Sequence, residues 1–203
     1  MHYRSDRADA LRHRRHRGAI LLSLALALFL ARIEPAGGAD SSTWGILRTP
    51  GAVVLLRHGT APGTFDPPDA RMDDCATQRN LDANGRAQAR RIGEAFRQRG
   101  LSVDAVLSSP RCRCLDTARL AFGKAEAWEP LQGAPRDSDQ RQRRLAEIRQ
   151  RIEAHQTGSP LVLVTHGSVI TGVTGRHVRM GELVVLQRRA DGRHAVVGQL
   201  FVD

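Results

Sequence analysis

Residues 52–60 have the sequence AVVLLRHGT, an unbroken apolar run that ends in an Arg-His-Gly triplet. Residues 161–168, LVLVTHGS, repeat this pattern more than one hundred residues later. Runs of β-branched and aliphatic residues without polar alternation are typical of strands buried on both faces, as in parallel sheets covered by helices. The two stretches therefore predict neighbouring elements of a sheet that lies between helical layers.

The rest of the chain alternates strand and helix patterns. A further strand is predicted from Val103 to Leu107. Two more are predicted at 182–188 and 194–201, joined by a turn at Asp191-Gly192. Residues 61–80 are rich in Pro and Gly and are expected to form a loop, and residues 40–50 an exposed lead-in. The predicted helices cover 82–99, the segment that follows Ser108-Ser109-Pro110 as far as 122, 138–155, and a segment from Ser168. This order predicts an α/β fold, a three-layer α/β/α sandwich with a mostly parallel central sheet.

Length and charge limit the class of protein. A length of 203 residues allows one domain of ordinary size. The chain has a net charge of +10, and residues 40–203 alone carry a net charge of +6. Such an excess can attract an anionic substrate. Only 4% of the residues are aromatic, and no basic run is interleaved with aromatics, so nucleic acid is not an expected partner.

The N-terminus has the order of an export signal. Residues 1–18 are basic, residues 19–31 are apolar but too short to span a bilayer comfortably, and small residues follow at 36–39. We expect a signal peptide over 1–39, cleaved after Ala39, and a mature domain over 40–203 that is periplasmic or secreted. The alternative is an uncleaved anchor, which would then be the only membrane contact.

Export would permit a disulfide among the three cysteines. Cys75 can pair with Cys112 or with Cys114, leaving one thiol free, and three reduced thiols are the alternative. The spacing of these cysteines matches no common zinc site. No metal and no cofactor are therefore expected.

Chemically active side chains follow the ends of the predicted strands. His58 and His166 each end a strand and precede a glycine, Arg57 adjoins His58, and Arg113 falls in the first turn of a helix after a third strand. Ligands of open α/β sheets bind at the carboxyl ends of strands. Two imidazoles and two guanidinium groups at one edge predict a phosphate pocket that contains a nucleophile. Gly59, Thr60 and Gly167 are expected to bring backbone close to the substrate.

These motifs together resemble the histidine phosphatase (phosphoglycerate mutase-like) superfamily. The resemblance rests on Arg57-His58-Gly59, on Ser108-Ser109-Pro110-x-x-Arg113 and on His166-Gly167, and the segment from Thr77 to Ala89 is also similar. It covers residues 51–186 and implies a phosphohistidine intermediate on His58, with Arg57, Arg113 and His166 completing the pocket. A small exported branch of the superfamily is the expected place of this chain.

The general acid is where the chain departs from that pattern. The larger members carry an Asp directly after the second His, or a Glu after the Arg-bearing helix. Here Gly167 directly follows His166, and the stretch after the Arg113 helix reads Trp128-Glu129-Pro130-Leu131-Gln132-Gly133, so the acid is unassigned. The candidates, in falling order of preference, are Glu182, Asp66, Glu129 and Asp137. Without a strong acid, phosphoryl groups on good leaving groups, such as phosphoramidates or acyl phosphates, are the favoured substrates.

The sequence thus predicts an exported, metal-independent phosphatase that hydrolyses phosphomonoesters. The short segment between Arg113 and His166 leaves little room for a cap, so an open pocket is expected. That suits a phosphorylated small molecule, a phosphosugar of an envelope glycan, or a phosphoprotein. The alternatives are a non-catalytic domain that binds phospholigands and a phosphoglycerate mutase-like phosphotransferase.

Overall fold

A six-stranded mixed sheet forms the centre of the computed structural model, which describes residues 38–133, 135 and 137–203. The spatial order of the strands is β3-β2-β4-β1-β5-β6. Strands β3, β2, β4 and β1 are mutually parallel, whereas β5 and β6 are antiparallel additions beside β1. The strands are β1 (Val53–Arg57), β2 (Val106–Ser108), β3 (Glu126–Ala127), β4 (Leu161–Thr165), β5 (Glu182–Arg188) and β6 (His194–Phe201).

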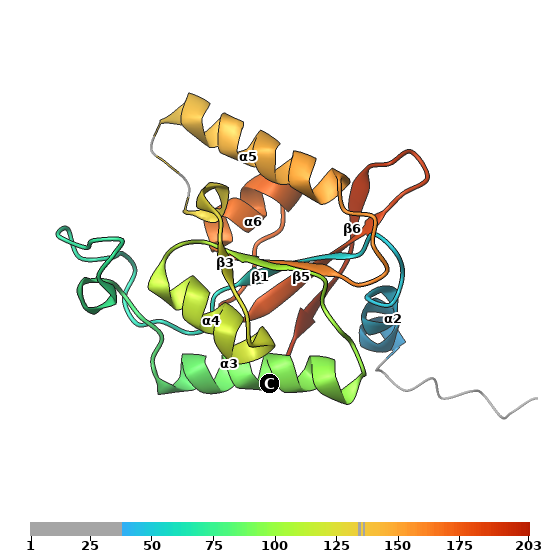
Figure 1. Cartoon of the computed structure of the whole chain (residues 1–203), viewed down its shortest axis with the longest axis horizontal. Helices are drawn as coiled ribbons and strands as arrows, with labels where there is room; N and C mark the ends of the chain where they lie inside the picture. The colour runs from blue at the N-terminus through green and yellow to red at the C-terminus, as the bar shows by residue number, and fades with distance from the viewer. Residues whose placement is uncertain (1–37, 134, 136) are drawn as a thin grey trace, which may run out of the picture. The chain divides into compact units, whose positions relative to one another are not determined.

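Helices cover both faces of the sheet (Figure 1). One layer contains α3 (Ala83–Gln98) and α4 (Cys112–Phe122), and the opposite layer contains α5 (Ser138–Glu153) and α6 (Gly167–Thr174). Alternate residues of β1 point to the two layers, Val54 and Leu56 into one core and Val53 and Leu55 into the other. This arrangement confirms the predicted α/β sandwich, because a strand buried on both faces needs apolar residues at every position.

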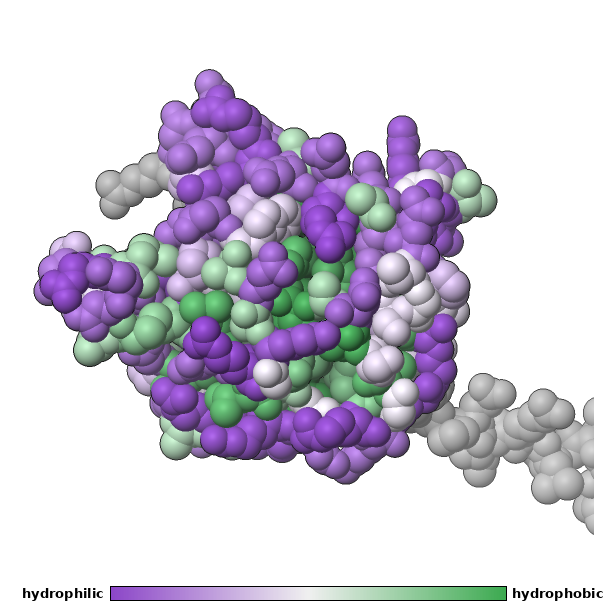
Figure 2. Space-filling model, viewed as in Figure 1, coloured by the Kyte–Doolittle hydropathy of each residue, from purple (hydrophilic) through white to green (hydrophobic). Residues whose placement is uncertain are grey.

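Among the described helices, the two longest, α3 and α5, begin at aspartate caps. The Asp82 carboxylate accepts a hydrogen bond from the Gly85 N–H at 2.7 Å, and Asp137 accepts one from the Gln140 N–H at 2.6 Å. Helix α5 buries only Leu145, Ile148 and Ile152, and its outer surface is hydrophilic in Figure 2. Its apolar stripe is the one that the sequence predicts.

The lead-in predicted at 40–50 is wrong. Residues Gly38–Ile46 form a helix, α2, and Leu47 after it is fully buried. The Trp44 ring packs edge-on against Phe96 at 5.3 Å, and the Arg99 guanidinium lies 4.3 Å from the Trp44 ring centroid. Burial of one tryptophan against α3 stabilises a short helix that has little amphipathic pattern of its own.

The start of α4 also differs from the prediction. The helix begins at Cys112, after Arg111, and Ser109 does not cap it. Instead the Ser109 hydroxyl lies 2.9 Å from Nε2 of His166 and accepts the Arg111 N–H at 3.3 Å. A tertiary contact therefore uses the hydroxyl that local sequence rules assign to the helix. Strand β2 likewise begins at Val106 rather than 103, where its ladder to β4 starts.

The segment between β1 and α3 is a long loop with one short 3-10 turn, Cys75–Thr77. A disulfide joins Cys75 to Cys112 at the start of α4, while Cys114 is buried and free. This resolves the predicted pairing in favour of Cys112. The predicted leader falls almost wholly outside the described residues. Within the described part of the chain, no helix has the length and apolarity needed to cross a membrane.

Candidate active site

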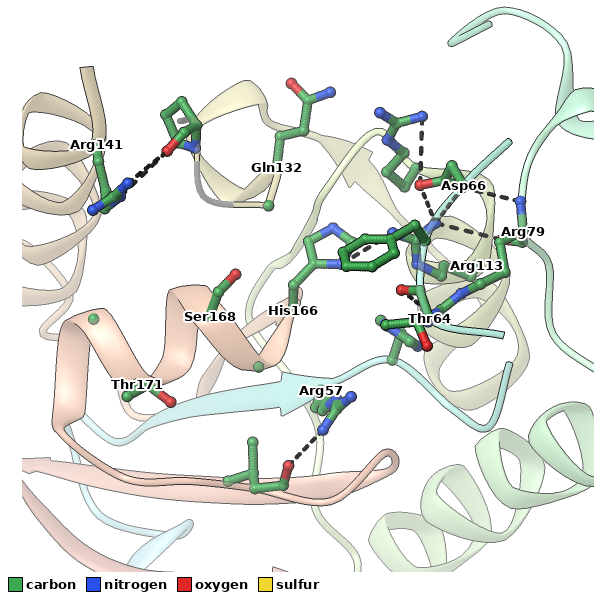
Figure 3. A pocket seen from close by; sticks show the side chains of 18 of the residues that line it. Arg57, Thr64, Asp66, Arg79, Arg113, Gln132, Arg141, His166, Ser168 and Thr171 are labelled. Atoms are coloured by element: carbon green, nitrogen blue, oxygen red, sulfur yellow. Dashed lines mark hydrogen bonds and ion pairs between the residues drawn. The ribbon is translucent and has the colours of Figure 1, made fainter. Parts of the chain in front are cut away.

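A cavity of about 1080 Å³ opens at the carboxyl ends of β1, β2 and β4. Its walls come from these strand ends, from the loop after β1, and from α4, α5 and α6 (Figure 3). Among the described residues that line it, six are arginines and only one is an acid, so the cavity is strongly cationic. The arginines are Arg57, Arg79, Arg111, Arg113, Arg141 and Arg144.

His58 lies in this cavity with its Nε2 unprotonated. Its Nδ1 is 2.8 Å from the Gly59 carbonyl oxygen, which can only accept, so Nδ1 carries the proton. Its Nε2 is 3.4 Å from Nη2 of Arg79, which can only donate. Burial, together with the nearby Arg113, Arg79 and Arg57, lowers the pKa of His58 to about 3. The imidazole is therefore neutral at physiological pH, and its lone pair points toward the guanidinium groups.

His166 lies beside His58 with both ring nitrogens engaged by protein. The ring centroids are 5.4 Å apart, which brings the two strand-end histidines together as the sequence predicts. Nη2 of Arg113 is 3.4 Å from Nδ1 of His166, so Nδ1 accepts and Nε2 carries the proton that faces the Ser109 hydroxyl. Burial lowers the pKa of His166 well below its usual range, with Arg113 adding to the effect.

Three arginines surround the two imidazoles. Arg57 is held by a 2.7 Å hydrogen bond from Nη1 to the Val178 carbonyl, and Arg113 is almost fully buried. The Nε atoms of Arg57, Arg79 and Arg113 are buried and lack a hydrogen-bond partner within the described structure. Burial also lowers the pKa values of Arg57 and Arg79. Unpaired buried donors on converging guanidinium groups fit a tetrahedral oxyanion, which accepts several hydrogen bonds at once.

Asp66 supplies the one carboxylate among the described residues that line the cavity. It accepts a 2.8 Å hydrogen bond from Nη1 of Arg113 and a 3.0 Å bond from the Arg79 backbone N–H. The Arg79 N–H and the Arg113 charge outweigh the opposing effect of burial and lower the pKa of Asp66. The carboxylate is therefore ionised near neutral pH, and it balances part of the arginine charge.

The structure does not bring every predicted site residue to the cavity. Gly59 is not among the lining residues, and a Cβ there would meet the Gly85 carbonyl oxygen at 2.8 Å. Its small size allows the turn after β1 to pack closely against the start of α3. The Thr60 N–H and hydroxyl both face Oε1 of Gln88, at 3.2 and 3.4 Å, because Gln88 ties this turn to α3. Gly167, in contrast, does line the cavity.

Glu182, the leading candidate acid, also lies away from the cavity lining. Its carboxylate accepts hydrogen bonds from the Arg179 N–H at 2.7 Å and from the Gln199 amide at 3.0 Å. Those contacts order the turn into β5 and hold the side chain there. Glu129 in the 3-10 turn Glu129–Leu131 and the α5 cap Asp137 do not line the cavity either. Of the four candidates, Asp66 alone reaches it.

Sequence reasoning missed Arg79, Arg111, Arg141 and Arg144 as lining residues. The chain has 31 basic residues, and the only sequence criterion that distinguished an arginine of the site from one on the surface was its position directly after a predicted strand. Arg79 lies in the long loop, and Arg141 and Arg144 lie on α5, so none of these three meets that criterion. The resemblance of residues 77–81 to the family segment was the one pattern that pointed near Arg79.

Cys114 is the remaining polar group beside the site. Its sulfur is 3.6 Å from Nε2 of His166, and complete burial raises its pKa to about 12. It is therefore a protonated, inert thiol at neutral pH. No cluster of three or more His, Cys, Asp or Glu side chains with metal-binding geometry occurs in the described part of the chain.

Comparison with known proteins shows a similarity in sequence over part of the chain and a similarity in fold. The model of the histidine phosphatase superfamily (branch 1) matches residues 53–136. The putative phosphohistidine phosphatase SixA from Agrobacterium tumefaciens is 23% identical with a TM-score of 0.53, covering 74% of this chain and 97% of its own. The phosphoglycerate mutase from Thermus thermophilus has the same identity and TM-score, over 75% and 99% of the two chains.

A mycobacterial glucosyl-3-phosphoglycerate phosphatase is more distant in sequence, at 16% identity and a TM-score of 0.52, over 71% of this chain and 96% of its own. No curated protein has a significant match to the chain in sequence. The structural relatives include phosphatases and a mutase, so the fold alone does not separate these activities. Residues 53–136 thus match the model of the histidine phosphatase superfamily (branch 1), and the described domain shares its fold with these solved structures.

Proposed function

We propose that the protein is a phosphatase that hydrolyses phosphomonoesters through a phosphohistidine on Nε2 of His58. The observation that carries this is the tautomer of His58. The Gly59 carbonyl fixes the proton on Nδ1, so a lone pair on a neutral imidazole faces the arginines of the cavity. A neutral imidazole is a competent nucleophile, and guanidinium groups stabilise charge on the transferred phosphoryl oxygens.

The reaction proceeds in two displacements. Nε2 of His58 attacks phosphorus, a P–N bond forms, and the P–O bond to the leaving group breaks with its electron pair on that oxygen. Water then attacks the phosphohistidine, the P–N bond breaks, and the imidazole regains its lone pair. The products are inorganic phosphate and the alcohol, and the leaving oxygen takes its proton from water. Arg57, Arg79 and Arg113 bind the phosphoryl oxygens throughout, with His166 beside them.

Asp66 shapes substrate preference through its charge. Because its pKa is lowered by Arg79 and Arg113, it is ionised at neutral pH and does not protonate the leaving group. The favoured substrates therefore have leaving groups that depart without a side-chain acid, such as aryl phosphates, acyl phosphates and phosphoramidates. A steep dependence of kcat on leaving-group pKa is the expected kinetic sign.

Alkaline quenching during turnover of p-nitrophenyl phosphate tests the intermediate. Mass spectrometry is expected to find phosphate on His58 in the wild type and none in His58→Gln, whose fold is checked by circular dichroism. EDTA is expected to leave the rate unchanged. Turnover without a His58 adduct, or retained activity in His58→Gln, contradicts the proposed function.

A non-catalytic domain that binds phospholigands is the second candidate, favoured by the ionised state of Asp66. In that case vanadate binds, but neither turnover nor an adduct is found across aryl and acyl phosphates. Mutase activity, in turn, requires that the phosphoryl group return to the same carbon skeleton, which transfer between positions of a phosphoglycerate measures.

We also propose that the protein works outside the cytoplasm. The basic, apolar and small-residue order of residues 1–39 and the Cys75–Cys112 disulfide both support this, because structural disulfides persist in oxidising compartments. The wide cavity suits a phosphorylated small molecule, a phosphosugar on a glycan or a phosphoprotein. N-terminal sequencing of the protein from cell fractions tests the location, and an intact Met1 in the cytoplasm contradicts it.

A further inference from the structure

Phe65 is an exposed phenylalanine in the wall of the cavity. It is 84% exposed, and Met72 is the only other large hydrophobic residue that is exposed in the described part of the chain. Single exposed apolar residues are common on protein surfaces and need no special explanation. Phe65 differs because it lines the cavity that contains His58, where it is the largest apolar side chain among the described lining residues.

The backbone on both sides of Phe65 is fixed by two arginines of the cavity. On one side, Nη1 of Arg79 donates to the Thr64 carbonyl oxygen at 2.9 Å. On the other side, the Asp66 carboxylate accepts from the Arg79 N–H at 3.0 Å and from Nη1 of Arg113 at 2.8 Å. Figure 3 shows Thr64 and Asp66 beside these arginines. The Phe65 backbone therefore has a defined place next to the guanidinium groups, while its ring stays exposed.

A ring in this position suits the organic part of a phosphate ester. Guanidinium groups bind the phosphoryl oxygens, and the leaving group extends away from them into the rest of the cavity. Aromatic side chains pack against other rings in offset-stacked or edge-to-face arrangements, and such contacts remove apolar surface from water on both partners. A side chain on a fixed backbone favours such a contact, because only its own rotamer has to be ordered on binding.

We propose that Phe65 binds the ring of the leaving group, so that preferred substrates carry their phosphate on an aromatic ring or a sugar ring. This inference rests on the proposed function, because the phosphoryl group must lie among the arginines for the ring to reach Phe65. Both kinds of ring present the same chemistry to a phenylalanine, an apolar face. Phe65 takes no part in the bonds that form and break; it determines which phosphomonoesters bind well.

Binding of phosphonates to the wild-type protein tests the contact without turnover, because their P–C bond is not hydrolysed. Phenylphosphonate and methylphosphonate share the anionic group and differ in the ring. Phenylphosphonate is expected to bind about tenfold more tightly in calorimetric titrations, as one aromatic contact and the area it buries provide. Phe65→Ala is expected to reduce this ratio to about twofold or less, and Phe65→Tyr, which keeps the ring, to preserve it.

A second pair of probes distinguishes the two kinds of ring. Glucose 1-phosphate and ethyl phosphate are titrated into the His58→Gln protein, with and without Phe65→Ala, so that neither ester turns over. The pair of probes whose ratio of affinities falls in Phe65→Ala identifies the ring as aromatic or as a sugar.

Met72→Ala is the matched control, since Met72 is exposed on the same loop but does not line the cavity. It is expected to leave both ratios of affinities unchanged. Equal affinities within both pairs, a ring preference that survives Phe65→Ala, or equal losses in the Phe65 and Met72 variants overturn the contact. Failure of the proposed function is seen separately, as absence of p-nitrophenyl phosphate hydrolysis and of the His58 adduct in the wild type.

Discussion

The two His-Gly pairs, His58-Gly59 and His166-Gly167, look alike in sequence and differ in the folded protein. Both follow buried parallel strands, and their imidazoles meet at 5.4 Å. His58 donates from Nδ1 to a backbone carbonyl and keeps the Nε2 lone pair in the cavity. In His166, Nε2 is hydrogen-bonded to the Ser109 hydroxyl and Nδ1 accepts from the Arg113 guanidinium. One local pattern thus leaves the Nε2 lone pair open at the first site and engages both ring nitrogens at the second, which agrees with the nucleophilic role proposed for His58.

The glycines of the two pairs differ as well. Gly59 is required by packing, because α3 approaches the backbone there, whereas a Cβ at Gly167 would have the Arg57 guanidinium as its nearest neighbour, at 3.5 Å. The surroundings of each strand end come from segments far away in sequence. A repeated motif therefore marks one edge of the sheet, but the neighbours of each copy in space decide its hydrogen bonding and protonation.

The largest effect should separate the two histidines. His58→Ala is expected to reduce kcat at least about 10⁴-fold, because the covalent route is lost. His166→Ala is expected to reduce it by roughly 10²–10³-fold, as removal of one stabilising group does. Steady-state hydrolysis of p-nitrophenyl phosphate measures both. Equal losses, or a phosphorylated His166, would show that the comparison assigns the roles wrongly.

Breaking the Cys75–Cys112 disulfide should affect the surroundings of His58 more than those of His166. The disulfide anchors the loop that carries Arg79, and Arg79 contacts His58. The double variant Cys75→Ser, Cys112→Ser is expected to lose roughly 4 kcal/mol of unfolding free energy, the chain-entropy estimate for a separation of 37 residues. Urea unfolding with and without reductant measures it. Reductant should lower wild-type stability to a similar extent and leave the double variant unchanged. A wild type indifferent to reductant argues against the bond.

Acid should destabilise the protein through the buried neutral histidines. With the pKa of His58 at about 3 when folded and about 6.5 when unfolded, the unfolded chain binds more protons between these values. The contribution of His58 to the free energy of unfolding is therefore fully present above about pH 6.5 and decreases as the pH falls. At pH 5 the loss is about 2 kcal/mol. Urea unfolding of wild type and His58→Gln between pH 7 and 5 measures the difference. Parallel pH profiles of the two proteins contradict the buried neutral state.

The smallest effect should separate the two glycines. Gly59→Ala places a methyl group 2.8 Å from the Gly85 carbonyl oxygen and is expected to reduce stability by roughly 1–2 kcal/mol, as mild overpacking does. Gly167→Ala makes an ordinary contact at 3.5 Å and is expected to change stability by less than about 0.5 kcal/mol. Thermal denaturation of the two variants compares them. A larger loss in Gly167→Ala reverses this part of the comparison.

The sequence alone determined the layers and the edge of the sheet that holds the site. Continuous apolar runs specify buried strands, and helical stripes such as Leu145, Ile148 and Ile152 specify the faces that cover them. Parallel strands end at a common edge, so His58, His166, Arg57 and Arg113 converge there whatever the loops do. These features depend on local periodicity and on general rules of α/β topology.

Only the tertiary structure decided the state of each group at that edge. The tautomer of His58 is fixed by contacts with its neighbour Gly59 and with the distant Arg79. Asp66 is ionised because the Arg79 backbone N–H and the Arg113 guanidinium both donate to it. Glu182 is held elsewhere by Gln199, and Cys112 rather than Cys114 reaches Cys75. Hydrogen bonds, charge pairing and burial act over a few ångströms in space, and the partners they join here are up to tens of residues apart along the chain.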